Sequence, residues 1–246
     1  MPAPAPLYPR ILLKLSGEVL RAKNAPDCID SAILADMAAK IDAVRATGVQ
    51  VAIVIGGGNI FRGLSGTGKG VPRAHGDNMG MLATMINSLA LQAALATRDV
   101  PAVVLSSRAM PAICELFTFQ RARALLEAGT VVILGGGSGN PFFTTDSAAA
   151  LRAAEIGASL LVKATKVDGI YTADPTKDPS ATRFDRITYA ECLSRRLKVM
   201  DSTAFSLCQD NAIPIMVLNF FQPGALLAAL SGDTTVATLV TEEGKS

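Results

Sequence analysis

Two lysines stand at the ends of apolar segments, where a charged side chain needs a partner. Lys14 interrupts one such segment and is followed by Ser16 and Gly17, whereas Lys163 ends another. A buried ammonium group is costly unless it meets an anion or an acid, although a lysine at a sheet edge can also extend to solvent. The glycine next to it would let backbone N–H groups approach a phosphate. The pattern indicates phosphate chemistry, with the solvent-reaching lysine as the alternative.

Residues 138–146, with the sequence Ser-Gly-Asn-Pro-Phe-Phe-Thr-Thr-Asp, connect an apolar segment to an Ala-rich one. Gly139 permits backbone angles that other residues resist, and Pro141 restricts the turn. Thr144 and Thr145 would place hydroxyl and N–H groups at a helix N-terminus, where the helix dipole favours an anion. This strand–loop–helix junction is therefore predicted to hold a phosphate.

Three successive glycines, Gly56, Gly57 and Gly58, end another apolar segment, and Arg62 follows within one turn. Because such a run has no evident packing use, we favour close approach of backbone N–H groups to a ligand over a plain turn. Arg62 could clamp a phosphate or could be an ordinary solvated arginine.

Three aspartates each have a structural and a functional interpretation. Asp146 and Asp201 could be helix N-caps, or could hold the Lys14 ammonium group and help to carry a metal ion. Asp77 could cap a helix that starts at residue 78, or could accept hydrogen bonds from sugar hydroxyls.

Two nucleotide-binding fingerprints are excluded. Residues 63–69 satisfy G-x-x-x-x-G-K, but Gly70 replaces the usual Ser or Thr, and the segment neither follows a strand nor opens a helix. No G-x-G-x-x-G is present. His75, the single histidine, is expected in a loop without a catalytic role. The cysteines are expected to be buried thiols in a reducing compartment and not zinc ligands: they are Cys28, Cys114, Cys192 and Cys208.

Composition limits the partners. A net charge of +2 without a basic stripe, together with the absence of Trp, argues against a nucleic-acid partner. No apolar run approaches the roughly 20 residues that span a bilayer, so we expect no membrane partner. Residues 1–9 are expected to form a disordered arm and lack the features of a signal peptide.

Apolar segments that read as strands alternate with helical ones, which predicts a mainly parallel sheet covered on both faces. Strands are expected at residues 11–15, 49–55, 103–106, 131–134, 159–163, 215–218 and 236–240. Helices are expected at residues 31–47, 78–97, 120–128, 146–156, 188–197, 203–209 and 224–230. Residues 174–186 are interpreted as a surface loop or a seam between small subdomains.

Taken together and in order, these motifs resemble the bacterial UMP kinases (uridylate kinases) of the amino-acid kinase family. The resemblance runs from about residue 11 to about residue 240, and residues 139–146 and 163–169 carry it most specifically. It implies an α/β fold, a three-layer α/β/α sandwich with a central, mostly parallel sheet. It also implies one domain over residues 10–246, with an acceptor-binding part at about 10–158 and an ATP-binding part at about 159–240.

The activity that the resemblance implies is transfer of phosphate from ATP to UMP with Mg²⁺, a step of pyrimidine nucleotide biosynthesis, in a cytoplasmic homohexamer. The implied ATP-binding residues are Lys14, Leu15, Ser16, Gly17, Gly58, Arg62, Thr165, Tyr171 and Asp174. The implied UMP-binding residues are Gly57, Asp77, Ser138, Gly139, Asn140, Pro141, Phe142, Phe143, Thr144 and Thr145. The implied catalytic residues are Lys14, Arg62, Asp146, Lys163 and Asp201, and no residue is assigned directly to a metal. Because a phosphate acceptor is already anionic, in-line transfer is expected without a general base.

Two positions depart from the family pattern. Ser138 stands where the family often has Thr, a change that keeps the hydroxyl group. Residues 21–27 do not match the expected regulatory loop, which leaves activation by GTP and inhibition by UTP as open expectations.

Two other functions remain as alternatives. A family member that phosphorylates a carboxylate or carbamate would not need Asp77 or the loop at 138–145. A nucleotide-binding protein without catalysis would be expected to have lost Lys14, Asp146 or Asp201, and all three are present.

Overall fold

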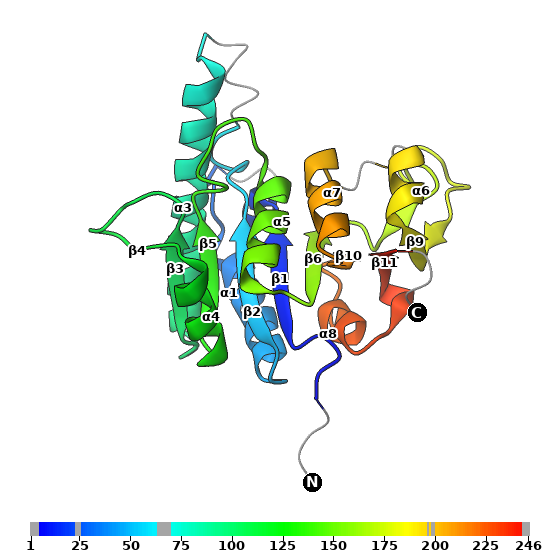
Figure 1. Cartoon of the computed structure of the whole chain (residues 1–246), viewed down its shortest axis with the longest axis horizontal. Coiled ribbons are helices and arrows are strands. Elements are labelled where there is room, and N and C mark those ends of the chain that lie inside the picture. Colours follow the sequence, from blue (N-terminus) through cyan, green and yellow to red (C-terminus); the bar gives the residue numbers. More distant parts are fainter. Residues whose placement is uncertain (1–4, 23–25, 63–69, 196, 198–199, 243–246) are drawn as a thin grey trace.

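A central sheet lies between two layers of helices in the computed structural model, which describes residues 5–22, 26–62, 70–195, 197 and 200–242 (Figure 1). The strands of the main sheet are β1 (Arg10–Leu15), β2 (Gln50–Ile55), β3 (Ala102–Ser106), β4 (Glu115–Leu116), β5 (Val131–Gly135), β6 (Leu160–Thr165), β9 (Arg186–Thr188), β10 (Ile215–Asn219) and β11 (Ala237–Thr241). Two short strands, β7 (Ile170–Tyr171) and β8 (Arg183–Phe184), form a separate hairpin. The α-helices are α1 (Ser31–Arg45), α3 (Arg73–Ala96), α4 (Phe119–Glu127), α5 (Thr145–Ile156), α6 (Tyr189–Ser194), α7 (Ser202–Asp210) and α8 (Ala225–Leu230). Two 3₁₀ turns are η1 (Gly17–Leu20) and η2 (Thr234–Val236).

Within the described ranges the main sheet has the strand order β4-β3-β5-β2-β1-β6-β10-β11-β9. Neighbouring strands run parallel except β10 and β11, which are antiparallel. The expected α/β/α fold with a mostly parallel sheet is therefore confirmed. The first strand of the chain is central, because β1 pairs with β2 on one side and with β6 on the other.

Alternating side chains of the strands fill two separate cores. Ile11 and Leu13 of β1 pack on the face covered by α1, α3 and α8. Leu12 packs on the opposite face, where α4, α5 and α7 contribute. By this alternation Lys14 points to the α5 side. Its Cα partner across the β1–β6 pair is Lys163, so two lysines stand side by side on that face.

Helix α3 begins five residues earlier than expected, after Pro72 at its N-cap. An ion pair between Arg73 and Asp77, spaced i and i+4, favours helix in this first stretch. His75 is consequently an exposed helical residue, and the expectation of a loop histidine was wrong. The capping interpretation of Asp77 was also wrong, because this residue lies inside the helix.

By length and composition alone, α3 could cross a membrane, which corrects the expectation that no apolar run approaches that length. Its Met85, Leu91 and Leu95 are nevertheless buried in the core, as in the core helix of a globular domain. The helix also extends beyond the sheet at the end where the strands finish, as Figure 1 shows.

Three other segments either differ from what the sequence predicted or lie, in whole or in part, outside the described residues. Residues 174–186 end in β8 and lead into β9, so part of the expected loop belongs to sheets. Tyr8 of the expected disordered arm packs against the core, and residues 1–4 lie outside the described ranges. The glycine-rich segment 63–69 also lies outside the described residues.

Candidate active site

The centre of the candidate site is one carboxylate held between two ammonium groups. Lys14 Nζ lies 2.7 Å from Asp146 Oδ1, and Lys163 Nζ lies 2.7 Å from Asp146 Oδ2. The lysines come from the carboxyl-end halves of β1 and β6, and the aspartate from the first turn of α5. All three side chains are at most 15% exposed. The lysine that extends to solvent is therefore excluded as an interpretation of Lys14.

The pKa values of this cluster show which interactions dominate. Burial opposes ionisation of Asp146, but the Lys14 and Lys163 ammonium groups outweigh it, so the pKa of this carboxyl lies below its ordinary value. Burial also lowers the pKa of Lys163, and the Lys14 ammonium adds to this effect while Asp146 opposes it. The cluster has one negative and two positive charges, and so can attract a further anion.

Asp201 is a helix N-cap, which confirms the first of the two interpretations proposed for it. As the N-cap of α7, its carboxylate accepts a hydrogen bond from Ala204 N at 2.8 Å. The same carboxylate accepts hydrogen bonds from the hydroxyls of Thr144 and Ser147 at the start of α5. Thr144, and not Asp146, is the N-cap of α5. Asp201 therefore ties the start of α7 to the start of α5.

A cavity of about 190 Å³ opens beside this cluster, between α3, the glycine loop at 56–58 and the loop at 137–145. Its lining residues are Gly57, Gly58, Phe61, Arg62, Asp77, Gly80, Met81, Thr84, Gly137, Ser138, Asn140, Phe143, Thr144 and Thr145. We call it the acceptor-side cavity, because it brings together most of the residues predicted for the acceptor. Gly139, Pro141 and Phe142, also predicted, are not among its lining residues.

Asp77 lines the acceptor-side cavity, and its carboxylate already accepts hydrogen bonds from two groups of the chain. Arg73 Nε donates to both carboxylate oxygens, at 2.9 and 2.7 Å, and Phe142 N donates to one of them at 2.7 Å. Phe142 has a φ of +72°, and its ring lies 5.6 Å from the Arg73 guanidinium carbon. A residue with a side chain is strained in this left-handed conformation, which the hydrogen bond to Asp77 helps to hold.

The glycines of this region are required by the packing of the chain itself. A Cβ on Gly17 would lie 2.3 Å from the carbonyl oxygen of Gly56, and a Cβ on Gly57 would lie 2.8 Å from Ala83 Cβ and Gly80 O of α3. The premise that the glycine run has no packing use was therefore wrong. Approach of these backbone N–H groups to a ligand stays a prediction.

A buried pair of amide side chains, which the sequence analysis missed, fixes the glycine loop. Asn87 Nδ2 donates to Gly56 O at 2.7 Å and to Asn59 Oδ1 at 2.8 Å, and Asn59 Nδ2 donates to Asn87 Oδ1 at 3.1 Å and to Cys28 O at 2.8 Å. Asn87 is fully buried in an otherwise apolar stretch of α3. Its interruption of that stretch is the same kind of signal that identified Lys14.

A second cavity, of about 570 Å³, has Lys163 of the cluster in its lining, and we call it the donor-side cavity. Its lining residues are Lys163, Thr165, Val167, Gly169, Ile170, Tyr171, Ala173, Asp174, Pro175, Leu197 and Val217. The three residues predicted for the ATP nucleoside, Thr165, Tyr171 and Asp174, are among them. The Tyr171 hydroxyl donates to Asp168 at 2.8 Å, and this hydrogen bond raises its pKa.

A polar cavity of about 480 Å³ is lined by Glu18, Arg21, Ala22, Gly58, Asn59, Arg62 and Lys166. It shares Gly58 and Arg62 with the acceptor-side cavity. Arg62 forms an ion pair with Glu18, a residue that the sequence analysis did not single out. The sequence analysis also missed Gly80, Met81 and Thr84, although their spacing from Asp77 places them on one face of α3.

The described residues contain no group of three His, Cys, Asp or Glu side chains that could hold a metal ion. Asp146 is occupied by two lysines, and Asp201 by hydroxyl and N–H donors. These carboxylates therefore do not fit a resident divalent cation. Cys192 and Cys208 are buried as expected, and burial raises the pKa of the Cys192 thiol to about 11. Cys28 and Cys114 are only partly buried, so the expectation of four buried thiols was wrong for these two residues.

Comparison with known proteins gives consistent matches. Residues 9–219 match the model of the amino acid kinase family. The chain is 55% identical over 227 residues to a uridylate kinase of Brucella abortus biovar 1 (strain 9-941), covering 92% of this chain and 94% of the relative. It is 53% identical over 237 residues to a uridylate kinase of Rhizobium meliloti (strain 1021), covering 96% and 98%.

Solved structures agree with these relatives. The chain is similar to the crystal structure of UMP kinase from Bacillus anthracis, with a TM-score of 0.92, 36% identity, and coverage of 96% of this chain and 97% of that one. It is also similar to UMP kinase from Ureaplasma parvum, with a TM-score of 0.90, 38% identity, and coverage of 95% and 98%.

Proposed function

Because this chain belongs to the amino acid kinase family, we propose that it transfers the γ-phosphoryl group of ATP to UMP, forming ADP and UDP for pyrimidine nucleotide biosynthesis. The protein is an enzyme, a phosphotransferase whose acceptor is a nucleoside monophosphate. The uridylate kinases that it resembles over most of their length support this assignment. The observation that carries it is the Lys14–Asp146–Lys163 cluster, since Lys163 also lines the donor-side cavity and α5 begins beside the acceptor-side cavity.

In this proposal the chain acts by position and charge. The ammonium groups of Lys14 and Lys163 neutralise charge on the phosphoryl group in transit, and Asp146 keeps both ammonium groups fixed before substrate arrives. Arg62 lines two adjoining cavities and adds a third cation. Because a phosphate monoester has a second pKa of about 6, the acceptor dianion attacks without a general base.

Magnesium enters the proposal as part of the substrate. Mg²⁺ is commonly held through substrate phosphates and retained waters, and needs few protein carboxylates. That mode suits a site whose carboxylates are occupied by lysines and hydroxyls. We therefore propose that Mg²⁺ arrives with ATP.

The proposal also covers the assembly of the protein and its regulation. A homohexamer in the cytoplasm is proposed from the family, and the apolar outer face of α3, where Met79, Leu82 and Ile86 are 43–52% exposed, offers a surface for contact between subunits. Light scattering of the purified protein tests the assembly. Activation by GTP and inhibition by UTP are proposed from the family alone, and are tested by adding each nucleotide to an assay of ADP release.

A coupled assay of ADP release also tests the assignment directly. The wild-type protein is incubated with Mg·ATP and, separately, with UMP, CMP, AMP, GMP, carbamate or an amino acid. We expect UMP to be strongly preferred. Equal turnover with CMP, or turnover only with carbamate or an amino acid, would contradict the assignment.

A further inference from the structure

One wall of the donor-side cavity comes from a very small element. The hairpin β7–β8 contributes Ile170 and Tyr171, and residues 173–175 lie in the connection that follows β7. Each of its strands has two residues, and in the described part of the chain β7 and β8 pair only with each other. A two-stranded hairpin of this size is not stable by itself. The wall must therefore be held by contacts with the rest of the chain: Leu239 N of β11 donates to Asp185 O directly after β8, at 2.9 Å, and the other attachments described below involve side chains.

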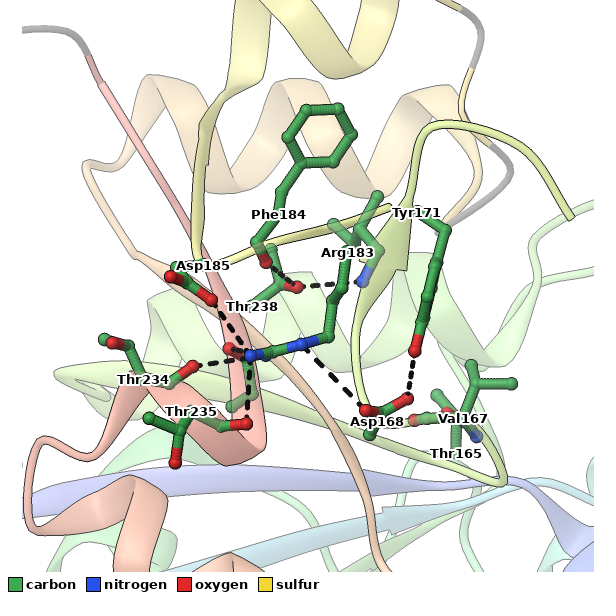
Figure 2. A network of polar contacts seen from close by, with 12 residues as sticks. Thr165, Val167, Asp168, Tyr171, Arg183, Phe184, Asp185, Thr234, Thr235 and Thr238 are labelled. Atoms are coloured by element: carbon green, nitrogen blue, oxygen red, sulfur yellow. Dashed lines mark hydrogen bonds and ion pairs between the residues drawn. The ribbon is translucent and has the colours of Figure 1, made fainter. Parts of the chain in front are cut away.

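Arg183 of β8 provides the main attachment, as Figure 2 shows. Its Nη1 donates to the carbonyl oxygens of Thr234 at 3.1 Å and Ala237 at 2.6 Å, and its Nη2 donates to Thr235 O at 2.9 Å. Nη2 also donates to Asp185 Oδ1 at 2.9 Å. The side chain is 15% exposed, and most of its donors are used on η2 and the start of β11.

A second attachment lies beside it. The Thr238 hydroxyl of β11 accepts a hydrogen bond from Ile170 N at 2.9 Å and donates one to Phe184 O, so that it contacts both strands of the hairpin. A Cβ on Gly169 would lie 2.4 Å from Thr238 Oγ1 and 2.8 Å from Arg183 Cδ. Hairpin and β11 therefore fit together closely at this point.

Arg183 is also connected to the cavity through Asp168. Its Nε lies 3.9 Å from Asp168 Oδ2, and Asp168 Oδ1 accepts the hydrogen bond from the Tyr171 hydroxyl. In Figure 2 the carboxylate of Asp168 lies between the guanidinium group and the tyrosine hydroxyl. Arg183 itself is absent from the residues that line the cavity, whereas Tyr171 lines it.

We propose that Arg183 is a positioning residue for the donor nucleotide: it fixes Asp168, Tyr171 and the β7–β8 hairpin on β11, and so shapes the wall that the nucleoside of ATP contacts. The inference rests on the proposed function, because it takes the donor-side cavity as the ATP site. It extends that function to a residue outside the cavity, which acts through the carboxylate and tyrosine in front of it.

The test compares Arg183→Met with Arg183→Lys, and uses Arg186→Met as the matched control, since Arg186 is exposed on the adjacent β9. For Arg183→Met we expect the KM for ATP and the calorimetric Kd for ATP to rise about tenfold, because the hairpin must be ordered when ATP binds. The kcat at saturating ATP and the KM for UMP stay within about twofold. Arg183→Lys, which keeps the charge and can still reach a carbonyl, recovers part of the loss, and Arg186→Met behaves as wild type.

A lower melting temperature with an unchanged KM and Kd for ATP would overturn the proposal, and so would an equal rise in the KM for both substrates. If Arg183→Met does not fold, Asp168→Ala is measured in its place, because it removes the link between Arg183 and Tyr171 and leaves the arginine bonds to η2 in place. An unchanged KM for ATP in that variant would equally reject the role. Failure of the wild-type protein to phosphorylate UMP would instead reject the proposed function, and the calorimetric Kd for ATP separates the two failures.

Discussion

The two cavities are built in different ways. The acceptor-side cavity is formed by main elements of the fold, with the glycine loop after β2 packed against α3 and the loop after β5 leading into α5. A buried amide pair, Asn59 and Asn87, holds its backbone from within the core. The donor-side cavity has a wall on the β7–β8 hairpin, which is held by Arg183 and Thr238.

Because of this difference, changes near one cavity should mainly affect the stability of the fold, and changes near the other should mainly affect the affinity for ATP. A change in the acceptor-side framework leaves buried polar groups without partners and should destabilise the whole fold. A change in the hairpin attachment should loosen one wall and act on ATP binding, with a smaller effect on global unfolding. The lysine–aspartate cluster between the cavities belongs to both sides, so its loss should be the most severe.

Asp146→Asn should have the largest effect on stability, because it leaves two buried ammonium groups without their counter-charge. We expect a loss of about 3–5 kcal/mol in the free energy of unfolding, measured by urea denaturation. Asp36→Asn, in an exposed pair with Lys40, is the control and should change stability by less than about 1 kcal/mol.

The pH dependence of that difference has a definite sign. The folded-state pKa of Asp146 is lowered, so its stabilisation is fully present above the ordinary pKa of 3.8 and is lost as the pH falls through the lowered value. The gap between wild type and Asp146→Asn should therefore be constant near neutrality and should shrink in acid. A gap that widened on acidification would contradict the assignment of charge in this cluster.

Lys14→Met tests the cluster without removing either cavity wall. Because the ammonium group is used mainly on charge that develops in the transition state, kcat should fall about 10²–10³-fold while the KM for UMP changes little. Steady-state kinetics with both substrates measures this, with Lys40→Met on α1 as the control. A variant with wild-type kcat and a raised KM would make Lys14 a binding group only.

Asn87→Leu tests the acceptor-side framework. Removal of the amide leaves Gly56 O and the Asn59 side chain with fewer partners, which should cost about 2–4 kcal/mol in unfolding free energy. Tyr171→Phe removes a single hydrogen bond on the donor side and should cost about 1 kcal/mol or less. Equal losses of unfolding free energy in the two variants would contradict the difference proposed between the two cavities.

His75→Asn should have the smallest effect. The histidine is exposed, and the proposed acceptor phosphate needs no base, so kcat and the acid limb of kcat/KM against pH should both be unchanged. Repeating the profile with the methylene phosphonate analogue of UMP, which has a higher pKa, should shift that limb. A limb that moved with the histidine substitution and stayed in place with the analogue would show an enzyme base.

The sequence predicted the parts of the site in which a charged side chain stands in an apolar segment, where its burial is costly without a partner. Lys14 and Lys163 interrupt apolar strands, and the carboxyl ends of parallel strands converge at one edge, so their meeting with an acid was foreseeable. The α/β/α fold followed from continuous apolar strands alternating with helices, and it is confirmed.

Other features left no such pattern. The strands of the β7–β8 hairpin have two residues each, which is too short for any periodicity. Arg183 mostly bonds backbone carbonyls, which every residue type supplies, so the sequence around residues 234–237 does not mark them as its partners. The early start of α3 is favoured by an ion pair between Arg73 and Asp77, which joins two residues outside the apolar stretch from which the helix was predicted.

The place of β1 has a consequence for synthesis on the ribosome. Residues 10–135 form β1 to β5, one contiguous half of the main sheet, and β6 to β11 follow later in the chain. When the first half folds before β6 has been made, β1 is an unpaired edge open to other nascent chains. Lys14 then lies on that edge as an unneutralised charge, which discourages strand addition until β6 pairs with β1 and α5 supplies Asp146. We therefore expect the residue proposed for phosphoryl transfer also to discourage aggregation of the half-made sheet.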